Sequence, residues 1–187
     1  MRRRSFLRTA ASIVPATGLQ PFYSDELRAQ AAGLPPPAAV VGAGEDRLGH
    51  PHQLGFDSLL FKVASHETKG GMFVVEHPRL LPGGPPLHLH LNQEEWFYVM
   101  EGEVAFQVGD QTLHLRRGES ILAPRQIPHT FSSVAEKPSR MLIAFCPAGK
   151  MEQFFLDVEN PKAPVKEAAF WRRYDMELVG PSPFWKS

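Results

Sequence analysis

The chain has one cysteine, no net charge and no long apolar run. Cys146 has no second cysteine to pair with, which excludes an intrachain disulfide, and we expect it to be a small buried hydrophobe after a strand over 141–145. Lys and Arg together number 20, as do Asp and Glu, which leaves no basic surface for a nucleic-acid partner. No apolar stretch reaches the roughly 18 residues that cross a bilayer, so we expect no membrane association of the mature protein.

What the chain has instead is a series of short strands separated by turns. Its 187 residues, 43% of them apolar, are enough for one domain with a sizeable core. Alternating residues predict strands over 58–63, 71–76, 87–91, 96–100, 104–108, 112–115, 120–123, 129–134 and 141–145. Gly and Pro fall between these strands, which is typical of an antiparallel sandwich or barrel. Two helices are predicted near the C-terminus, over 151–158 and 165–174.

One of these strands carries a pair of histidines. His88 and His90 are two residues apart, so their side chains point to the same face of the strand. Glu95 follows after a short turn and can swing in beside them. Two imidazoles and a carboxylate form a ligand set for one divalent metal ion, which could be iron, manganese, nickel, copper or zinc. A fourth ligand should come from elsewhere, and His129, which begins a later strand, is the candidate.

The two segments that hold these residues resemble the two motifs of the cupin superfamily. The first motif has the form G-x5-H-x-H-x3/4-E-x6-G, and it is matched by His88, His90, Glu95 and Gly102. The second has the form G-x5-P-x-G-x2-H-x3-N, and it is matched by Gly118, Pro124 and His129. The chain departs from the motifs at three places: Gly83 or Gly84 stands closer to His88 than the leading glycine should, Gln126 replaces a glycine and Ser133 replaces the asparagine.

The resemblance extends over roughly 59–149 and implies both a fold and an activity. The implied fold is all-β, an antiparallel double-stranded β-helix (the jelly-roll cupin barrel), followed here by the short C-terminal helices. Likeness to the quercetin dioxygenase group implies a metal-dependent dioxygenase that acts on a small aromatic or enolic molecule, such as a flavonol or catechol, with dioxygen as co-substrate. In that activity Glu95 would be the catalytic residue that takes the substrate's proton.

Two other functions stay open at this stage. One is a non-oxidative isomerase or lyase for a sugar or small acid, which needs a further acid, base or cation at the mouth of the barrel. Arg125 is the basic residue that the sequence places there. The other is a metal-dependent binding module without turnover. The family's tendency to pair also leaves open a homodimer through an edge strand such as 59–63.

Apolar residues next to the predicted ligands should form the walls of the site. The candidates for these walls are Phe97, Val99, Phe106 and Phe131. Trp96, Tyr98 and Met100 lie on the opposite face of their strand and are also expected in the core.

The remaining histidines are expected to have no part in the metal site. His50 and His52 should lie in a solvated linker, and His114 should point outward from its strand. His66 and His77 flank a strand without evident partners.

The first 31 residues resemble a twin-arginine export signal. Arg3-Arg4 is followed by Ser5 and the apolar pair Phe6-Leu7, then by a weakly apolar stretch and by the small-x-small site Ala29-Gln30-Ala31. We therefore expect export to the periplasm or the exterior. The predicted organisation is a signal over 1–31, a lead-in over 32–54, the barrel over 55–149 and a helical tail over 150–187.

Overall fold

The computed structural model describes residues 38–54 and 57–185, and the predicted export signal lies outside them. From Val41 onward the chain forms one compact unit. Among the described residues, no helix combines the length and the apolar character needed to cross a membrane.

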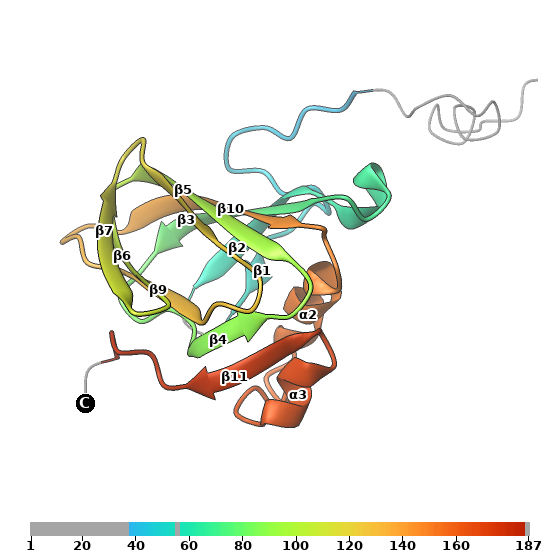
Figure 1. Ribbon diagram of the computed structural model, residues 1–187. Helices are drawn as coiled ribbons and strands as arrows, with labels where there is room; N and C mark the ends of the chain where they lie inside the picture. The colour runs from blue at the N-terminus through green and yellow to red at the C-terminus, as the bar shows by residue number, and fades with distance from the viewer. Residues whose placement is uncertain (1–37, 55–56, 186–187) are drawn as a thin grey trace, which may run out of the picture. The chain divides into compact units, whose positions relative to one another are not determined.

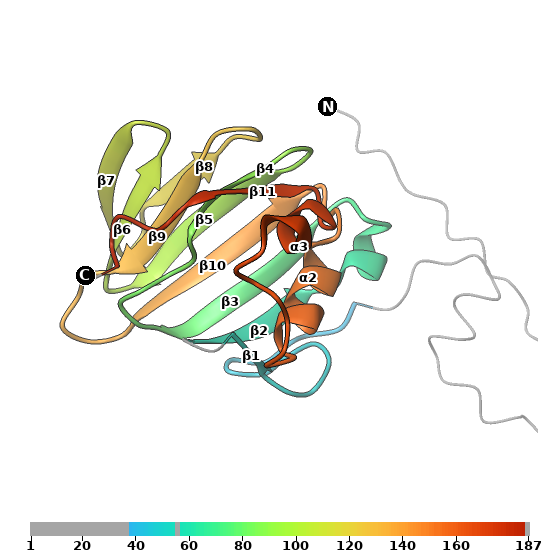
Figure 2. The same ribbon diagram turned by 90° about the horizontal axis from the view of Figure 1, so that it is seen from below.

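Two antiparallel sheets face each other in this unit (Figures 1 and 2). The first sheet has the strand order β1-β2-β3-β10-β5-β8 and the second the order β11-β4-β9-β6-β7. The first sheet consists of β1 (His52–Gln53), β2 (Ser58–Val63), β3 (Phe73–Leu80), β10 (Ser139–Cys146), β5 (Glu94–Glu101) and β8 (Ser120–Ala123). The second consists of β11 (Met176–Gly180), β4 (Leu87–His90), β9 (His129–Ser133), β6 (Glu103–Val108) and β7 (Gln111–Arg116). The predicted jelly-roll barrel is confirmed.

Aromatic side chains fill the space between the sheets. The rings that are fully buried there belong to Phe61, Phe73, Phe97, Phe106 and Phe145. Phe97 contacts Phe106 and Phe131 from the opposite sheet, with ring centroids 5.1 and 5.5 Å apart. Because burial of one Phe side chain stabilises the fold by about 1.5–3 kcal/mol, this cluster is a main source of the barrel's stability.

Strand β5 has one buried and one open face. Phe97 and Val99 are inaccessible to solvent, whereas Trp96 is 38% exposed. Trp96 stacks on Tyr98 at 5.9 Å on the outer surface. The expectation that Trp96, Tyr98 and Met100 belong to the core was therefore wrong, because apolar residues on both faces of a strand do not require that both faces be covered.

The segment after the barrel contains two short helices and a strand. Helix α2 (Met151–Val158) has the predicted bounds, and α3 (Ala168–Arg172) lies within the predicted helix over 165–174. Strand β11, which the sequence did not predict, pairs with β4 so that Met176 lies opposite His90 and Leu178 opposite His88. A short strand of this kind owes its existence to the edge on which it pairs, and a local pattern does not show that edge.

Cys146 also departs from expectation, because it is exposed. It ends β10 immediately after Phe145, which points into the core. Successive side chains of a strand point to opposite faces, so the thiol faces outward.

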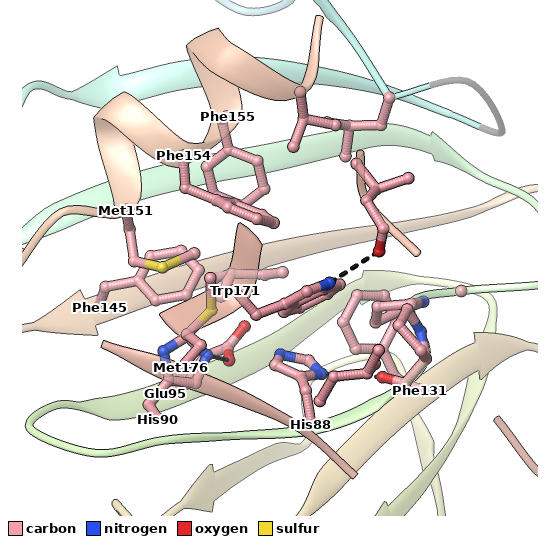
Figure 3. A pocket seen from close by; sticks show the side chains of 18 of the residues that line it. His88, His90, Glu95, Phe131, Phe145, Met151, Phe154, Phe155, Trp171 and Met176 are labelled. Atoms are coloured by element: carbon pink, nitrogen blue, oxygen red, sulfur yellow. Dashed lines mark hydrogen bonds and ion pairs between the residues drawn. The ribbon is translucent and has the colours of Figure 1, made fainter. Parts of the chain in front are cut away.

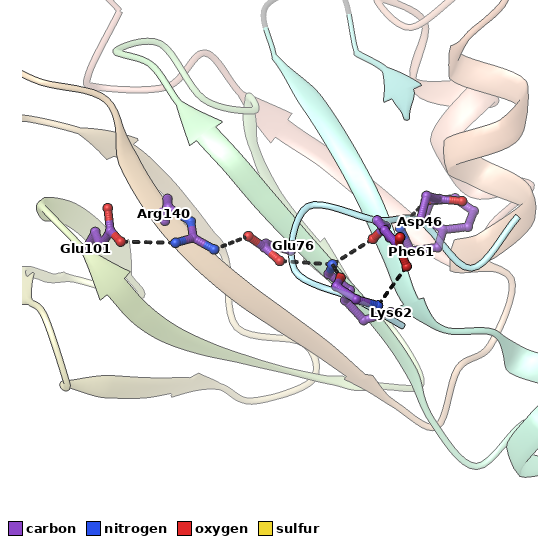
Figure 4. A network of polar contacts seen from close by, with 8 residues as sticks. Asp46, Phe61, Lys62, Glu76, Glu101 and Arg140 are labelled. Atoms are coloured by element: carbon purple, nitrogen blue, oxygen red, sulfur yellow. Dashed lines mark hydrogen bonds and ion pairs between the residues drawn. The ribbon is translucent and has the colours of Figure 1, made fainter. Parts of the chain in front are cut away.

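A chain of ion pairs ties four strands together on the outer face of the first sheet (Figure 4). Glu76 on β3 lies 3.2 Å from Lys62 Nζ on β2 and 2.8 Å from Arg140 on β10. Arg140 also pairs with Glu101 at the end of β5, at 3.0 Å. Burial raises the pKa of the Glu76 carboxyl, but Arg140 and Lys62 outweigh that effect and hold the pKa below its ordinary value. Glu76 is therefore ionised at neutral pH.

Candidate metal centre

The barrel brings the four predicted ligands together. His88 and His90 come from β4, Glu95 from β5 and His129 from β9, and His88 and His129 are register partners in the second sheet. All four are buried, and one donor atom from each lies within 4.8 Å of the others. Figure 3 shows His88, His90 and Glu95 at the same end of the pocket. The group could hold a metal ion, and the part of each residue as a ligand stays a prediction.

The hydrogen bonds of the three imidazoles fix which ring nitrogen carries a proton. His88 Nδ1 donates to the carbonyl of Pro86 at 2.9 Å, and His129 Nδ1 donates to the carbonyl of Ile127 at 3.0 Å. His90 Nδ1 lies 2.8 Å from the amide oxygen of Gln93. These oxygens only accept, so each Nδ1 must bear a hydrogen. In a neutral ring the Nε2 lone pair is then free, which is the state that binds a metal.

The Nε2 atoms of His90 and His129 meet at Glu95. Glu95 Oε2 lies 2.8 Å from His129 Nε2 and 3.0 Å from His90 Nε2. The Nε2 atom of His90 is buried and has no hydrogen-bond partner of acceptable geometry. A carboxylate and an imidazole lone pair repel each other, so without a metal a proton must lie in such a contact, as in the hydrogen bond between His129 Nε2 and Glu95 Oε2. These donor atoms therefore suit a divalent cation, because imidazole nitrogens and carboxylate oxygens bind such ions and because His90 Nε2 has no other partner.

The electrostatics of the group favour the same state. Burial lowers the pKa of His88 to about 3, with a further contribution from the neighbouring rings of His129 and His90, so His88 is neutral at physiological pH. Burial raises the pKa of Glu95, but its contacts with His129 and His90 outweigh that effect and hold the pKa well below its ordinary value. A neutral imidazole beside an ionised carboxylate is a ligand pair ready for a metal.

Gln93, which the sequence analysis did not single out, positions His90. Its amide nitrogen donates to the carbonyls of Pro147 and Ala148, at 3.0 and 3.2 Å. These two bonds fix which end of the amide faces the ring, so that its oxygen is presented to His90 Nδ1. The only signal in the sequence was its position between the second histidine and Glu95.

An apolar cavity of about 590 Å³ opens beside three of the four residues, His88, His90 and Glu95. Its other walls include the aromatic and sulfur-containing side chains of Phe131, Phe145, Met151, Phe154, Phe155, Trp171 and Met176 (Figure 3). Of the walls predicted from sequence, Phe131 lines the cavity. Phe97, Val99 and Phe106 do not, because they lie in the closed core of the barrel.

Several of the walls that the sequence missed come from α2 and α3. Met151, Phe154 and Phe155 fall at helical spacing, so α2 turns one apolar face toward the barrel, and this pattern could have been recognised. Trp171 on α3 contacts the ring of His88, with centroids 5.2 Å apart, and its indole nitrogen donates to the carbonyl of Val165 at 2.8 Å. Tyr174 after α3 donates a hydrogen bond to Asp157 of α2. The two helices are thus connected to each other and together cover the candidate site; we call this pair, α2 and α3, the roof.

The basic residue at the edge of the cavity is Lys166 and not the expected Arg125. Arg125 is exposed and forms an ion pair with Glu94 at 2.5 Å, away from the cavity. Glu94 accordingly points away from the donor group, because it neighbours Glu95 on β5 and successive side chains of a strand face opposite sides. Lys166, in the loop before α3, lines the cavity instead and is exposed at its edge.

Two of the remaining histidines are not where the sequence analysis placed them. His52 is fully buried, stacks on Phe61 and lies 2.6 Å from Glu159 just after α2, so it is not part of a solvated linker. His77 is also buried and has a partner, Asp57. His114 is on the surface, as expected, where it pairs with Glu103 at 3.1 Å.

Comparison with known proteins finds a match to one family model. Residues 79–145 match the family model Cupin_2, the cupin domain. Together with the barrel, this match supports membership of the cupin superfamily.

Three individual proteins illustrate the likeness. Oxidoreductase iacF of the fungus Pestalotiopsis fici is 44% identical over 120 residues, which are 58% of this chain and 54% of the relative. Polyketide synthase CurC of Streptomyces cyaneus is 31% identical over 75 residues, 40% of this chain and 49% of the relative. The chain thus spans about half the length of each. A crystal structure from Thermotoga maritima, described as a predicted oxalate decarboxylase, has a TM-score of 0.51 at 15% identity over 58% of this chain and 99% of the other, a likeness of fold.

Proposed function

We propose that the protein is a metal-dependent oxidoreductase, specifically a dioxygenase that acts on a small aromatic or enolic molecule such as a flavonol or catechol. The observation that carries the proposal is the junction of two features: three imidazoles and a carboxylate that could hold a metal, and an apolar cavity that ends on them. Four donors from protein leave coordination positions free on an octahedral ion such as iron or manganese, as catalysis requires. The oxidoreductase name of a relative, iacF, supports the reaction class.

The cavity supports the substrate class. A volume of about 590 Å³ suits a molecule of one to three rings. Its aromatic walls favour a flat apolar body, since offset or edge-on ring contacts add to the gain from burial. A small dianion such as oxalate would leave most of this space empty and would meet few hydrogen-bond donors. Polyketides carry keto and enol groups, so the name of the relative CurC also agrees with an enolic substrate.

The chain's own residues have separate tasks in this proposal. When bound, the metal supplies a Lewis acid that polarises a substrate oxygen. Glu95 is the one carboxylate among the residues that line the cavity, so it is the group that takes a proton from an enol or phenol there. The roof formed by α2 and α3 excludes water and holds the substrate ring against Trp171.

An oxygen-uptake assay tests the proposal. The purified chain, loaded in turn with iron, manganese, nickel, copper or zinc, is given a panel of flavonols, catechols and enolic acids, and dissolved oxygen is recorded. Oxygen consumption that requires one of these substrates and disappears in Glu95→Gln supports it. Conversion of a substrate without oxygen uptake would favour the isomerase or lyase, and tight binding without any product would favour a binding module.

We also propose that the chain is exported, on the strength of the N-terminal pattern around Arg3-Arg4. Expression of the full chain followed by N-terminal sequencing of the periplasmic fraction tests this. A mature protein that begins near Ala32 is expected, and a double variant that combines Arg3→Lys with Arg4→Lys should stay in the cytoplasm. Export that persists in the double variant would contradict the proposal.

A further inference from the structure

A second polar group faces the cavity, on the sheet opposite the three histidines. His77 lies on β3, where it shares the inward face with Phe73 and Val75, and it is 2% exposed. It lines the same cavity as His88, His90 and Glu95. An imidazole in an otherwise apolar wall carries a desolvation cost that the core alone does not explain.

One side of this ring is held by a buried carboxylate. His77 Nδ1 lies 2.5 Å from Asp57 Oδ2, and the Asp57 side chain is 3% exposed. The other carboxylate oxygen of Asp57 accepts the backbone N–H of Ser58 at 2.7 Å, which fixes the orientation of the group. Asp57 itself does not line the cavity. The carboxylate therefore stands behind the histidine and keeps the Nδ1 proton in place.

The other side of the ring is free. Within the part of the chain that the structure describes, no hydrogen bond to His77 Nε2 is present. The atom is also not one of the polar atoms that are fully buried without a partner, so it is not closed off from the cavity. In the neutral ring, with Nδ1 protonated toward Asp57, Nε2 presents a lone pair. In this pair, Asp57 orients the ring of His77, and His77 Nε2 is left as an acceptor for a ligand.

Phe131 relates the position of His77 to the candidate metal centre. Its ring meets the edge of Phe131 on β9, with centroids 5.7 Å apart. Phe131 lies on the same face of β9 as His129 and two residues further along, a distance of about 7 Å. A substrate ring lying over Phe131 would have His77 on one side and the histidine and carboxylate group on the other.

We propose that His77, oriented by Asp57, is a second substrate-binding residue, and that its Nε2 accepts a hydrogen bond from a hydroxyl at the end of the substrate remote from the metal. This inference rests on the proposed function and narrows it. The substrate is then a flat molecule with two oxygen functions, an enol or phenol directed at the histidine and carboxylate group and a hydroxyl on the far side of a ring.

Binding of a matched pair of probes tests the proposal without turnover. The full chain is stripped of metal with a chelator, and the affinities of 4-methylphenol, which keeps its proton at neutral pH, and of its methyl ether, 4-methylanisole, are measured by calorimetry. The wild type should prefer the hydroxyl compound by about tenfold, the value of one hydrogen bond to a partly charged acceptor. His77→Phe should lose this preference and Asp57→Asn should reduce it. His114→Phe, at an exposed histidine, is the matched control and should keep it.

A measurement on the wild type guards against variants that fold poorly. In protein labelled with ¹⁵N-histidine, the Nε2 resonance of His77 should move on addition of 4-methylphenol and stay in place with 4-methylanisole. Equal affinity of the wild type for the two probes, an unmoved resonance, or a preference that survives in folded His77→Phe would overturn the proposal. Because no metal or oxygen takes part, these results are independent of the oxygen-uptake assay.

Discussion

At the scale of single residues, the candidate metal centre depends on atoms that would not touch the metal. Each of its histidines has Nδ1 occupied by a main-chain carbonyl or by the Gln93 amide. Two of the three acceptors, the carbonyls of Pro86 and Ile127, lie two residues before the histidine that they hold. The local backbone therefore sets the tautomer of His88 and His129, whereas His90 relies on a side chain.

That difference leads to a prediction for Gln93. Gln93→Leu keeps the size of the side chain but removes the acceptor for His90 Nδ1, so the ring can rotate or change tautomer. The affinity for a divalent metal should fall by about 10- to 100-fold. A competition titration with a chromophoric chelator measures it. Gln107→Leu, at a glutamine that contacts the carbonyl of Gly109, is the control and should leave the affinity unchanged.

Glu76 gives a prediction for the pH dependence of stability. Folding holds the pKa of its carboxyl below the ordinary value of 4.5, so the folded state favours the ionised form. The stabilisation is present above the pKa of the unfolded state and is lost as the pH falls through the lower folded value. Glu76→Gln should therefore lower the free energy of unfolding by about 1–3 kcal/mol at pH 7, and by progressively less below pH 4.5.

Urea unfolding at several pH values measures this difference. Glu94→Gln is a suitable control, because Glu94 pairs with Arg125 in an exposed position. An effect of Glu76→Gln that is the same at pH 7 and pH 3 would show that the ion pairs with Lys62 and Arg140 are not its source.

The sequence was most informative for residues whose spacing is itself the signal. His88, His90 and Glu95 lie in one motif, and strand periodicity alone directs the two histidines to one face. His129 could be added because of its motif. The dyad of His77 and Asp57 could not be predicted in this way, because its members are 20 residues apart and meet only through the pairing of strands.

At the scale of elements, aromatic contacts hold helix α2, one of the two helices of the roof, against the barrel. Phe155 of α2 packs against three rings of the barrel, Phe61, Phe73 and Phe145, with centroids 5.8 to 6.4 Å away. The amphipathic face of α2 is thus the element that closes the barrel and also gives the cavity its wall.

Truncation of this residue should have two effects. Phe155→Ala should lower the free energy of unfolding by about 3–5 kcal/mol, because it leaves a void among rings that cannot fully collapse. It should also enlarge the cavity and weaken binding of an aromatic ligand. Thermal and urea unfolding measure the first effect. Val134→Ala, at a side chain that is 45% exposed, is the control and should change stability by less than about 0.5 kcal/mol.

The segment that leads into β4 passes so close to β9 that it requires a glycine at position 84. Gly84 has a φ of 73°, and a Cβ at this position would overlap the carbonyl oxygen of Phe131 on β9. Gly84→Ala should therefore cost about 2–4 kcal/mol from left-handed strain and overpacking, and should lower metal affinity by moving His88 away from His129. Gly180→Ala is the matched control, since a Cβ added there would have no atom within 4 Å and its φ is ordinary. Equal stability of the two variants, measured by thermal unfolding, would contradict this account of the first motif's displaced glycine.

The strands of the barrel could be predicted because each has its own pattern and its own turns. β11 could not, because Met176–Gly180 becomes a strand only on the edge of β4. The roof could be predicted as helices but not as a roof, since the sequence does not show which surface the apolar face of α2 covers.

At the scale of the whole molecule, the barrel does not decide the chemistry, because one fold hosts many reactions. What distinguishes this chain is the combination of a buried donor group with a large apolar cavity beside it. Both features arise from contacts between distant parts of the chain: two sheets supply the donors, and the segment after the barrel supplies the roof. The proposed chemistry depends above all on whether these donors hold a metal.

Metal analysis of the purified full chain tests that claim most directly. After equilibration with a slight excess of each candidate divalent ion and removal of the unbound fraction, mass spectrometry of the metal content should give one tightly held ion per wild-type chain. His88→Ala and His129→Ala should each lose it while the circular dichroism of the barrel is retained, and His114→Ala should keep it. A wild type that stays metal-free under these conditions, or folded His88→Ala and His129→Ala variants with full metal content, would contradict the account.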